Sequence, residues 1–163
     1  MNRNSCFACA LAVAAVSLAL PASSADLPKS GKYSAHYGWT FSGQVQKLGD
    51  DRTIYAGVLP GVMFNNEGKG FMHKARVDCI LYNDVNKGRA NANGTCTVTD
   101  ADGDKVFVEW RCAGVMPACL GTERFVGGTG KYTGISGDQK FQGNFIGDTG
   151  AGWSDWSGDY KLP

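Results

Sequence analysis

Apolar and polar residues alternate along most of the chain from residue 32 onward, in short segments without the period of an α-helix. Clusters of Gly, Asn and Asp interrupt the alternation, as turns do between β-strands. Short connections between the segments favour antiparallel pairing of consecutive strands. The pattern predicts eight strands, over residues 32–47, 52–64, 70–83, 89–99, 105–113, 119–126, 137–147 and 152–162.

No helix is predicted that would cover a face of this sheet, so the sheet must bury one face against itself. A closed barrel does so and removes exposed edge strands, whereas an open sandwich of two sheets is the alternative. We therefore expect an all-β fold, a single antiparallel eight-stranded up-and-down barrel. Its one helical element is expected as a single turn in the glycine-rich segment 127–134.

Two predicted turns fix the register of three strands. The sequence from Asn86 to Arg89 suits a two-residue loop, which places Cys79 opposite Cys96. Residues 100–104 suit a three-residue loop with a left-handed glycine. One face of these strands is then apolar and the other charged, so the apolar face must point into the barrel. The inward residues are Val77, Cys79, Cys96, Val98, Val106, Val108, Trp110 and Cys112, and the outward ones are Lys74, Arg76, Asp78, Glu109 and Arg111.

The first 25 residues have a different character. Asn2 and Arg3 precede an apolar run over residues 6–20, and small residues lead up to Ala25, which is typical of a secretory signal peptide. The run is shorter than the ~20 apolar residues of a membrane-spanning helix. We expect a signal peptide over residues 1–25, a barrel domain over residues 26–163, a periplasmic or secreted protein, and no membrane association after cleavage.

Four cysteines follow the expected cleavage site. An even number of cysteines in an exported domain predicts two disulfides. A four-cysteine metal site is the rival interpretation, but no Cys-x-x-Cys pair occurs. The predicted register favours the pairs Cys79–Cys96 and Cys112–Cys119. Each disulfide is expected to stabilise the fold by about 2–3 kcal/mol.

The charge balance argues against some partners. Without Arg3 the chain has 15 basic and 15 acidic residues, so bulk charge favours binding neither to nucleic acid nor to an anionic membrane. The glycine-rich segment lacks the spacing of a phosphate loop, and residues 100–104 lack the Gly and Glu of an EF-hand, leaving only a weak surface calcium site as an alternative. We predict no metal site and no cofactor, and the catalytic residues, if the protein is an enzyme, stay unknown.

The predicted interior is rich in aromatic rings. Tyr37 and Trp39 on the first strand, Trp110 on the fifth and Trp156 on the last point inward, which is typical of a small-molecule pocket. His73 shares the inward face of the third predicted strand, where an imidazole is suited to orient a polar group of a ligand. Two alternatives stay open: His73 lies at the barrel mouth, bonded to a carbonyl or water, and the rings fill the interior.

The segment from Phe125 to Gly137, FVGGTGKYTGISG, resembles the Gly-Gly-Thr-Gly-Lys-aromatic segment of allene-oxide-cyclase-like barrel proteins, and plant dirigent proteins carry a similar segment. Residues 94–104 and 156–163 resemble small exported bacterial proteins of this type, mostly of unassigned function. The resemblance implies a calycin-like antiparallel barrel, often oligomeric. It carries over no catalytic residue.

Three functions stay open at this point. The first is binding of a small apolar or aromatic ligand in the lumen, without a reaction, by His73, Tyr37, Trp39, Trp110 and Trp156. The second is a cofactor-independent isomerase or cyclase of the allene oxide cyclase type, in which a shaped cavity holds the substrate in one conformer. The third is a solid-core structural barrel whose outer face meets a partner. The expected partners are a small-molecule ligand and, from the resemblance, further copies of the chain.

Overall fold

The computed structural model describes residues 27–147 and 149–163. The signal peptide predicted over residues 1–25 lies outside these residues. Within the described part, no helix has the length and apolar character that a membrane crossing requires.

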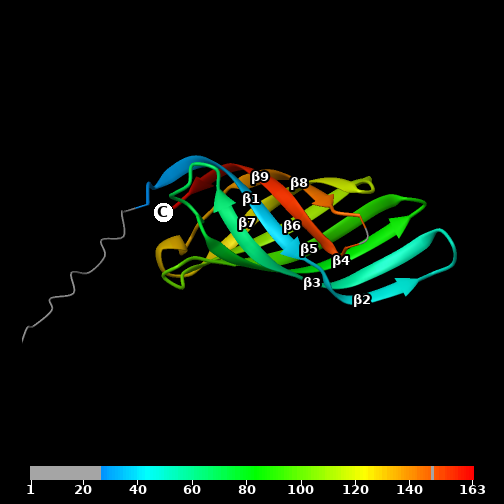
Figure 1. Ribbon diagram of the computed structural model, residues 1–163. Coiled ribbons are helices and arrows are strands. Elements are labelled where there is room, and N and C mark those ends of the chain that lie inside the picture. Colours follow the sequence, from blue (N-terminus) through cyan, green and yellow to red (C-terminus); the bar gives the residue numbers. More distant parts are fainter. Residues whose placement is uncertain (1–26, 148) are drawn as a thin grey trace, which may run out of the picture.

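One antiparallel sheet contains the strands of the barrel. Its elements are β1 (Ser30–Thr40), β2 (Ser42–Lys47), β3 (Arg52–Asn65), β4 (Ala75–Asn86), β5 (Arg89–Thr99), β6 (Lys105–Val115), β7 (Ala118–Gly128), the 3-10 turn η1 (Gly130–Tyr132), β8 (Asp138–Phe145) and β9 (Ala151–Lys161). Neighbours in the sequence pair from β2 to β9, and β1 pairs with both β9 and β3, which closes the barrel (Figure 1). The predicted all-β, eight-stranded antiparallel barrel is confirmed, and β2 is an additional strand outside the closed ring.

The first predicted strand is divided in two at Phe41. β1 pairs with the second half of β3, whereas β2 pairs with the first half. Gly43 and Gly57 face each other in this second pairing, where a Cβ on Gly43 would lie 2.3 Å from the carbonyl oxygen of Ala56. The hairpin made by β2 and the first half of β3 projects beyond the barrel, away from the C-terminus (Figure 1).

The third predicted strand begins five residues later than expected, at Ala75. Met72 and Lys74 have φ angles of 56° and 59°, in the left-handed region, which an extended strand does not contain. Residues 70–74 therefore form a turn, and the alternation of inward and outward side chains begins only with β4.

The register predicted for the central hairpins is confirmed. The two-residue loop at positions 87–88 has positive φ angles at both residues, and Cys79 lies opposite Cys96. Gly94 lies opposite Trp110, where a Cβ on the glycine would come within 2.7 Å of the indole ring. The residues predicted to point inward on β4, β5 and β6 are buried, apart from the half-buried Trp110.

Both predicted disulfides are present. Cys79–Cys96 joins β4 to β5, and Cys112–Cys119 joins β6 to β7. Because disulfides persist in oxidising compartments, the two bonds are compatible with the predicted periplasmic or secreted location.

Aromatic side chains fill the end of the barrel that holds the C-terminus. Phe71, from the turn before β4, is stacked on Tyr160 with ring centroids 4.2 Å apart. Tyr33 and Tyr132 meet the Phe71 ring edge-on, with centroid distances of 4.9 and 5.9 Å. All four rings are buried, so this half of the interior is solid.

The glycine-rich segment is held by the acidic loop between β5 and β6. η1 is the helical turn that was predicted there. The Lys131 ammonium lies 2.6 Å from the carboxylate of Asp100 and 2.5 Å from that of Asp102, and the Tyr132 hydroxyl donates to Asp100 at 3.0 Å. Gly130 has a φ of 52°, which favours glycine. The segment therefore closes the solid end of the barrel.

Candidate functional site

The other end of the barrel, toward the β2–β3 hairpin, contains a cavity of about 50 Å³. Most of its walls are aromatic rings, aliphatic side chains and the four cysteines of the two disulfides. A cavity of this size holds roughly three to five water-sized groups, far fewer than the roughly 300–1,000 Å³ of pockets for drug-sized ligands. The interior is thus hollow in one half only. This outcome lies between the two alternatives that the sequence left open, a ligand pocket and an interior filled by aromatic rings.

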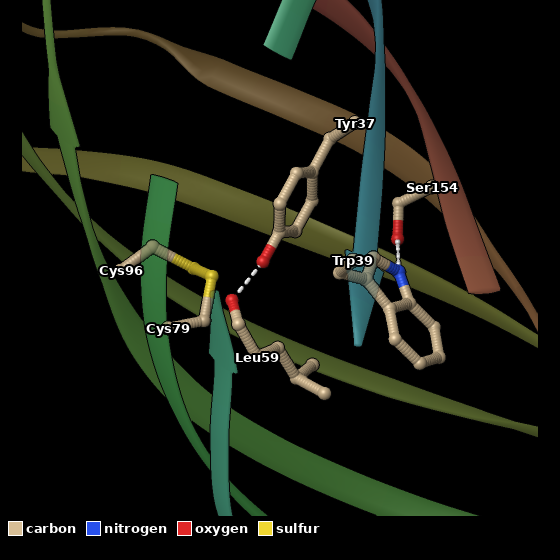
Figure 2. Close-up of a disulfide and its surroundings, with 6 residues drawn as sticks. All are labelled: Tyr37, Trp39, Leu59, Cys79, Cys96 and Ser154. Atoms are coloured by element: carbon tan, nitrogen blue, oxygen red, sulfur yellow. Dashed lines mark hydrogen bonds between the residues drawn. A yellow bond between two sulfur atoms is a disulfide. The ribbon is translucent and has the colours of Figure 1, made fainter. Parts of the chain in front are cut away.

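The four inward aromatic residues predicted for a ligand site all line this cavity: Tyr37, Trp39, Trp110 and Trp156. The Tyr37 hydroxyl donates to the carbonyl oxygen of Leu59 beside the Cys79–Cys96 disulfide (Figure 2). Burial, with the nearby charge of Asp78, raises the pKa of the Tyr37 hydroxyl, which keeps it neutral.

A second wall group is also fully engaged. The Trp39 Nε1–H donates to the Ser154 hydroxyl at 3.2 Å (Figure 2), and the Trp39 ring meets Phe145 edge-on at 5.1 Å. Since the polar atoms of Tyr37 and Trp39 already have partners within the protein, these two side chains form fixed walls with no free donor for a ligand.

His73 lies elsewhere. Its ring packs edge-on against Phe64, with centroids 6.0 Å apart, and His36 stacks on the same ring at 5.7 Å. Phe64 is exposed on the outer face of β3, and His73 does not line the cavity. The predicted inward placement of His73 is wrong, because positive φ angles at Met72 and Lys74 make this segment a turn in which strand alternation does not hold.

Glu123 is a cavity residue that the sequence analysis missed. Its side chain is only 4% exposed and lines the cavity from β7. Burial raises the pKa of the Glu123 carboxyl well above its ordinary value, which favours the neutral acid. The signal for it was present, since Glu123 has the same parity on β7 as the buried Cys119 and Phe125.

Four buried polar atoms on the cavity wall have no hydrogen-bond partner among the described residues. They are the side-chain atoms Asn83 Oδ1, Trp110 Nε1, Glu123 Oε2 and Trp156 Nε1. An unsatisfied buried polar group costs about 1–3 kcal/mol, and native proteins satisfy most such groups with protein, water or ligand. The residues that line the cavity therefore carry two indole N–H donors, a carboxyl group and an amide oxygen that have no partner among the described residues.

Comparison with known proteins gives a likeness in fold. No known protein family and no curated protein matches the chain. The structure of the pterocarpan synthase dirigent protein GePTS1 matches this fold with a TM-score of 0.46 and 11% sequence identity. The match covers 88% of this chain and 96% of that one. The pterocarpan synthase dirigent protein PsPTS1 is 13% identical with a TM-score of 0.49, covering 84% and 97%. Both are dirigent proteins, but at these values neither a family nor a reaction follows for this chain.

Proposed function

We propose that the barrel is a ligand-binding protein whose cavity takes a small neutral group with hydrogen-bonding capacity on an otherwise apolar molecule. The observation that carries this proposal is that four residues lining one cavity each hold a buried polar atom without a partner among the described residues. The rest of the wall is mostly apolar, and the Tyr37 and Ser154 hydroxyls in it already have partners within the protein, so these four atoms are the features best able to orient a ligand.

The chemistry of the cavity favours a neutral ligand with an acceptor oxygen. The indole N–H groups of Trp110 and Trp156 are donors only, so they match a carbonyl, ether or hydroxyl oxygen. A charged ligand would lose its hydration without a charged partner, because the neighbouring Glu123 is held in its neutral form. A ketone, ester or alcohol function fits these conditions best.

The four tryptophans of the chain provide a direct test. In proton–nitrogen NMR spectra, the indole N–H signals of Trp110 and Trp156 report on the cavity. Trp153 is an internal reference, because this residue is 42% exposed and its indole N–H donates to Asp155 at 3.1 Å on the outer face. We expect cyclopentanone to shift the signals of Trp110 and Trp156 saturably and to leave that of Trp153 unchanged. Cyclopentane, which has the same ring without the acceptor, should bind more weakly.

Matched variants test whether the indole donor matters. Trp110→Phe removes one N–H group from the cavity and should weaken cyclopentanone binding by about tenfold, the value of one hydrogen bond inside a protein. Trp153→Phe should leave binding unchanged. Equal binding of cyclopentanone and cyclopentane, or no saturable shift with either, would contradict the proposal. If cyclopentanone binds as expected, native mass spectrometry of the protein from its own host would identify the natural ligand.

A further inference from the structure

The hairpin made by β2 and the first half of β3, residues 42–58, is here called the arm. All six residues of β2 are exposed, and the arm projects past the barrel at the end where the cavity lies (Figure 1). β2 pairs with β3 alone among the described strands. The arm therefore extends from the barrel rim beside the cavity and is not part of the closed barrel wall.

The strand register connects the inner face of the arm to the cavity wall. Val45 lies opposite Tyr55, Tyr55 opposite Asn83, and Asn83 opposite Ala92. Directly opposed residues in an antiparallel sheet share a face, and Asn83 and Ala92 line the cavity. Tyr55 and Val45 thus continue the cavity wall outward, and Val45 lies two strand spacings, roughly 10 Å, beyond Asn83.

The surface along this path is apolar. Leu59 lines the cavity, and Gly57 and Tyr55 follow it outward on the same face of β3. Phe41 lies over Gly57, since a Cβ there would come within 2.9 Å of the Phe41 ring, and Phe41 meets Tyr55 edge-on at 5.8 Å. Val45 ends the path with 54% of its surface exposed.

We propose that the inner face of the arm is a second part of the ligand site, which takes the apolar body of an amphiphilic ligand whose neutral polar head occupies the cavity. The inference rests on the proposed function. It explains why a cavity with polar groups on its wall is only about 50 Å³ in volume: the cavity holds the head, and the medium-length alkyl chain or ring system lies along Phe41, Tyr55 and Val45.

A series of methyl ketones from butanone to octanone tests this inference, with affinities measured from the Trp110 indole shift. Each methylene that becomes fully buried should tighten binding about fourfold, and each half-buried one about twofold. Val45→Thr should weaken octanone binding about threefold and leave butanone binding unchanged. Val58→Thr is the matched control, because Val58 belongs to the same arm, is 43% exposed and points to the outer face.

The outcomes separate the two proposals. If butanone shifts the Trp110 signal but octanone binds no more tightly, the arm is not part of the site and the proposed function stands. The same conclusion follows if the two threonine variants change octanone binding equally. If no ketone shifts the indole signals, both proposals are overturned.

Discussion

Replacing the buried acid Glu123 by glutamine should change how the stability of the barrel depends on pH. The side chain is 4% exposed, and burial raises its pKa well above the ordinary value of 4.5. In the folded protein the carboxyl therefore keeps its proton at pH values where the unfolded chain has already lost it. Glutamine has nearly the same shape and carries no titratable proton.

The sign and size of the effect follow from linkage. Above pH 4.5 the folded state binds one more proton at Glu123 than the unfolded state, so the free energy of unfolding falls as the pH rises. The slope is about 1.4 kcal/mol per pH unit until the native pKa is reached. In a domain of this size that corresponds to roughly 4 °C in melting temperature per pH unit. Below pH 4.5 both states are protonated and this contribution vanishes.

Urea unfolding from about pH 4 to about pH 8 measures the difference between the two proteins. We expect Glu123→Gln to gain about 1.4 kcal/mol on the wild type for each pH unit above the ordinary glutamate pKa until the native pKa of Glu123 is reached, whatever fixed offset the amide introduces. Glu67→Gln is the matched control, since Glu67 is exposed and should leave the profile unchanged. Parallel profiles for the wild type and Glu123→Gln would refute the assignment of Glu123 as a buried neutral acid.

Three further variants have definite expected outcomes. Gly94→Ala places a Cβ within 2.7 Å of the Trp110 ring and should cost about 1–3 kcal/mol in urea unfolding and shift the Trp110 indole signal. Asp100→Asn should lower the free energy of unfolding by about 1 kcal/mol at neutral pH. Burial acts to raise the pKa of Asp100, but hydrogen bonds from the lysine and tyrosine of η1 lower it overall. The stabilisation that Asp100 gives above its unfolded-state pKa therefore disappears as the pH falls through its native pKa. Replacing Cys112 and Cys119 by alanine should cost about 2 kcal/mol, because the closed loop is short.

Each of these has a control within the chain. Gly38→Ala should be neutral, because no atom of the described residues lies within 4 Å of a Cβ at that position. Asp50→Asn, at an exposed residue of the β2–β3 turn, should not change the acid limb of the stability profile as Asp100→Asn does. Removing the longer-loop disulfide Cys79–Cys96 should cost more than removing Cys112–Cys119, about 3 kcal/mol; the reverse order would contradict the loop-entropy explanation.

The closed barrel and its central registers were predictable because turn chemistry fixes strand pairing locally. The left-handed residues at positions 87–88 define one hairpin, and once that register is set, the opposition of Cys79 and Cys96 follows without any knowledge of the rest of the fold. The break at Phe41 was not predictable in the same way. Alternation continues through it, and the change of partner strand depends on how β3 is shared between β1 and β2.

Glu123 was missed for a different reason. Its neighbours on β7 alternate regularly, so parity alone places Glu123 inside, but a charged residue type suggests the outer face. The conflict between parity and polarity is itself informative, because burial of a carboxyl group carries a cost that a purely structural strand avoids. Where parity and residue type disagree within a well-defined strand, parity should be followed and the residue treated as a candidate site residue.

The distribution of solid and hollow regions in the barrel depends on residues 70–74, which the alternating pattern predicts as a strand but which form a turn. Read as a strand, residues 70–74 place His73 in the lumen and make Phe71 an ordinary wall residue. As a turn, the same residues direct His73 toward Phe64 on the outer face and insert Phe71 into the barrel end, where its ring stacks on Tyr160. The cavity at the end near Phe145 is lined by strand residues alone among the described residues, so it stays open there. The hollow half thus follows from which loop folds inward, and this depends on left-handed residues at Met72 and Lys74 that the residue types do not predict.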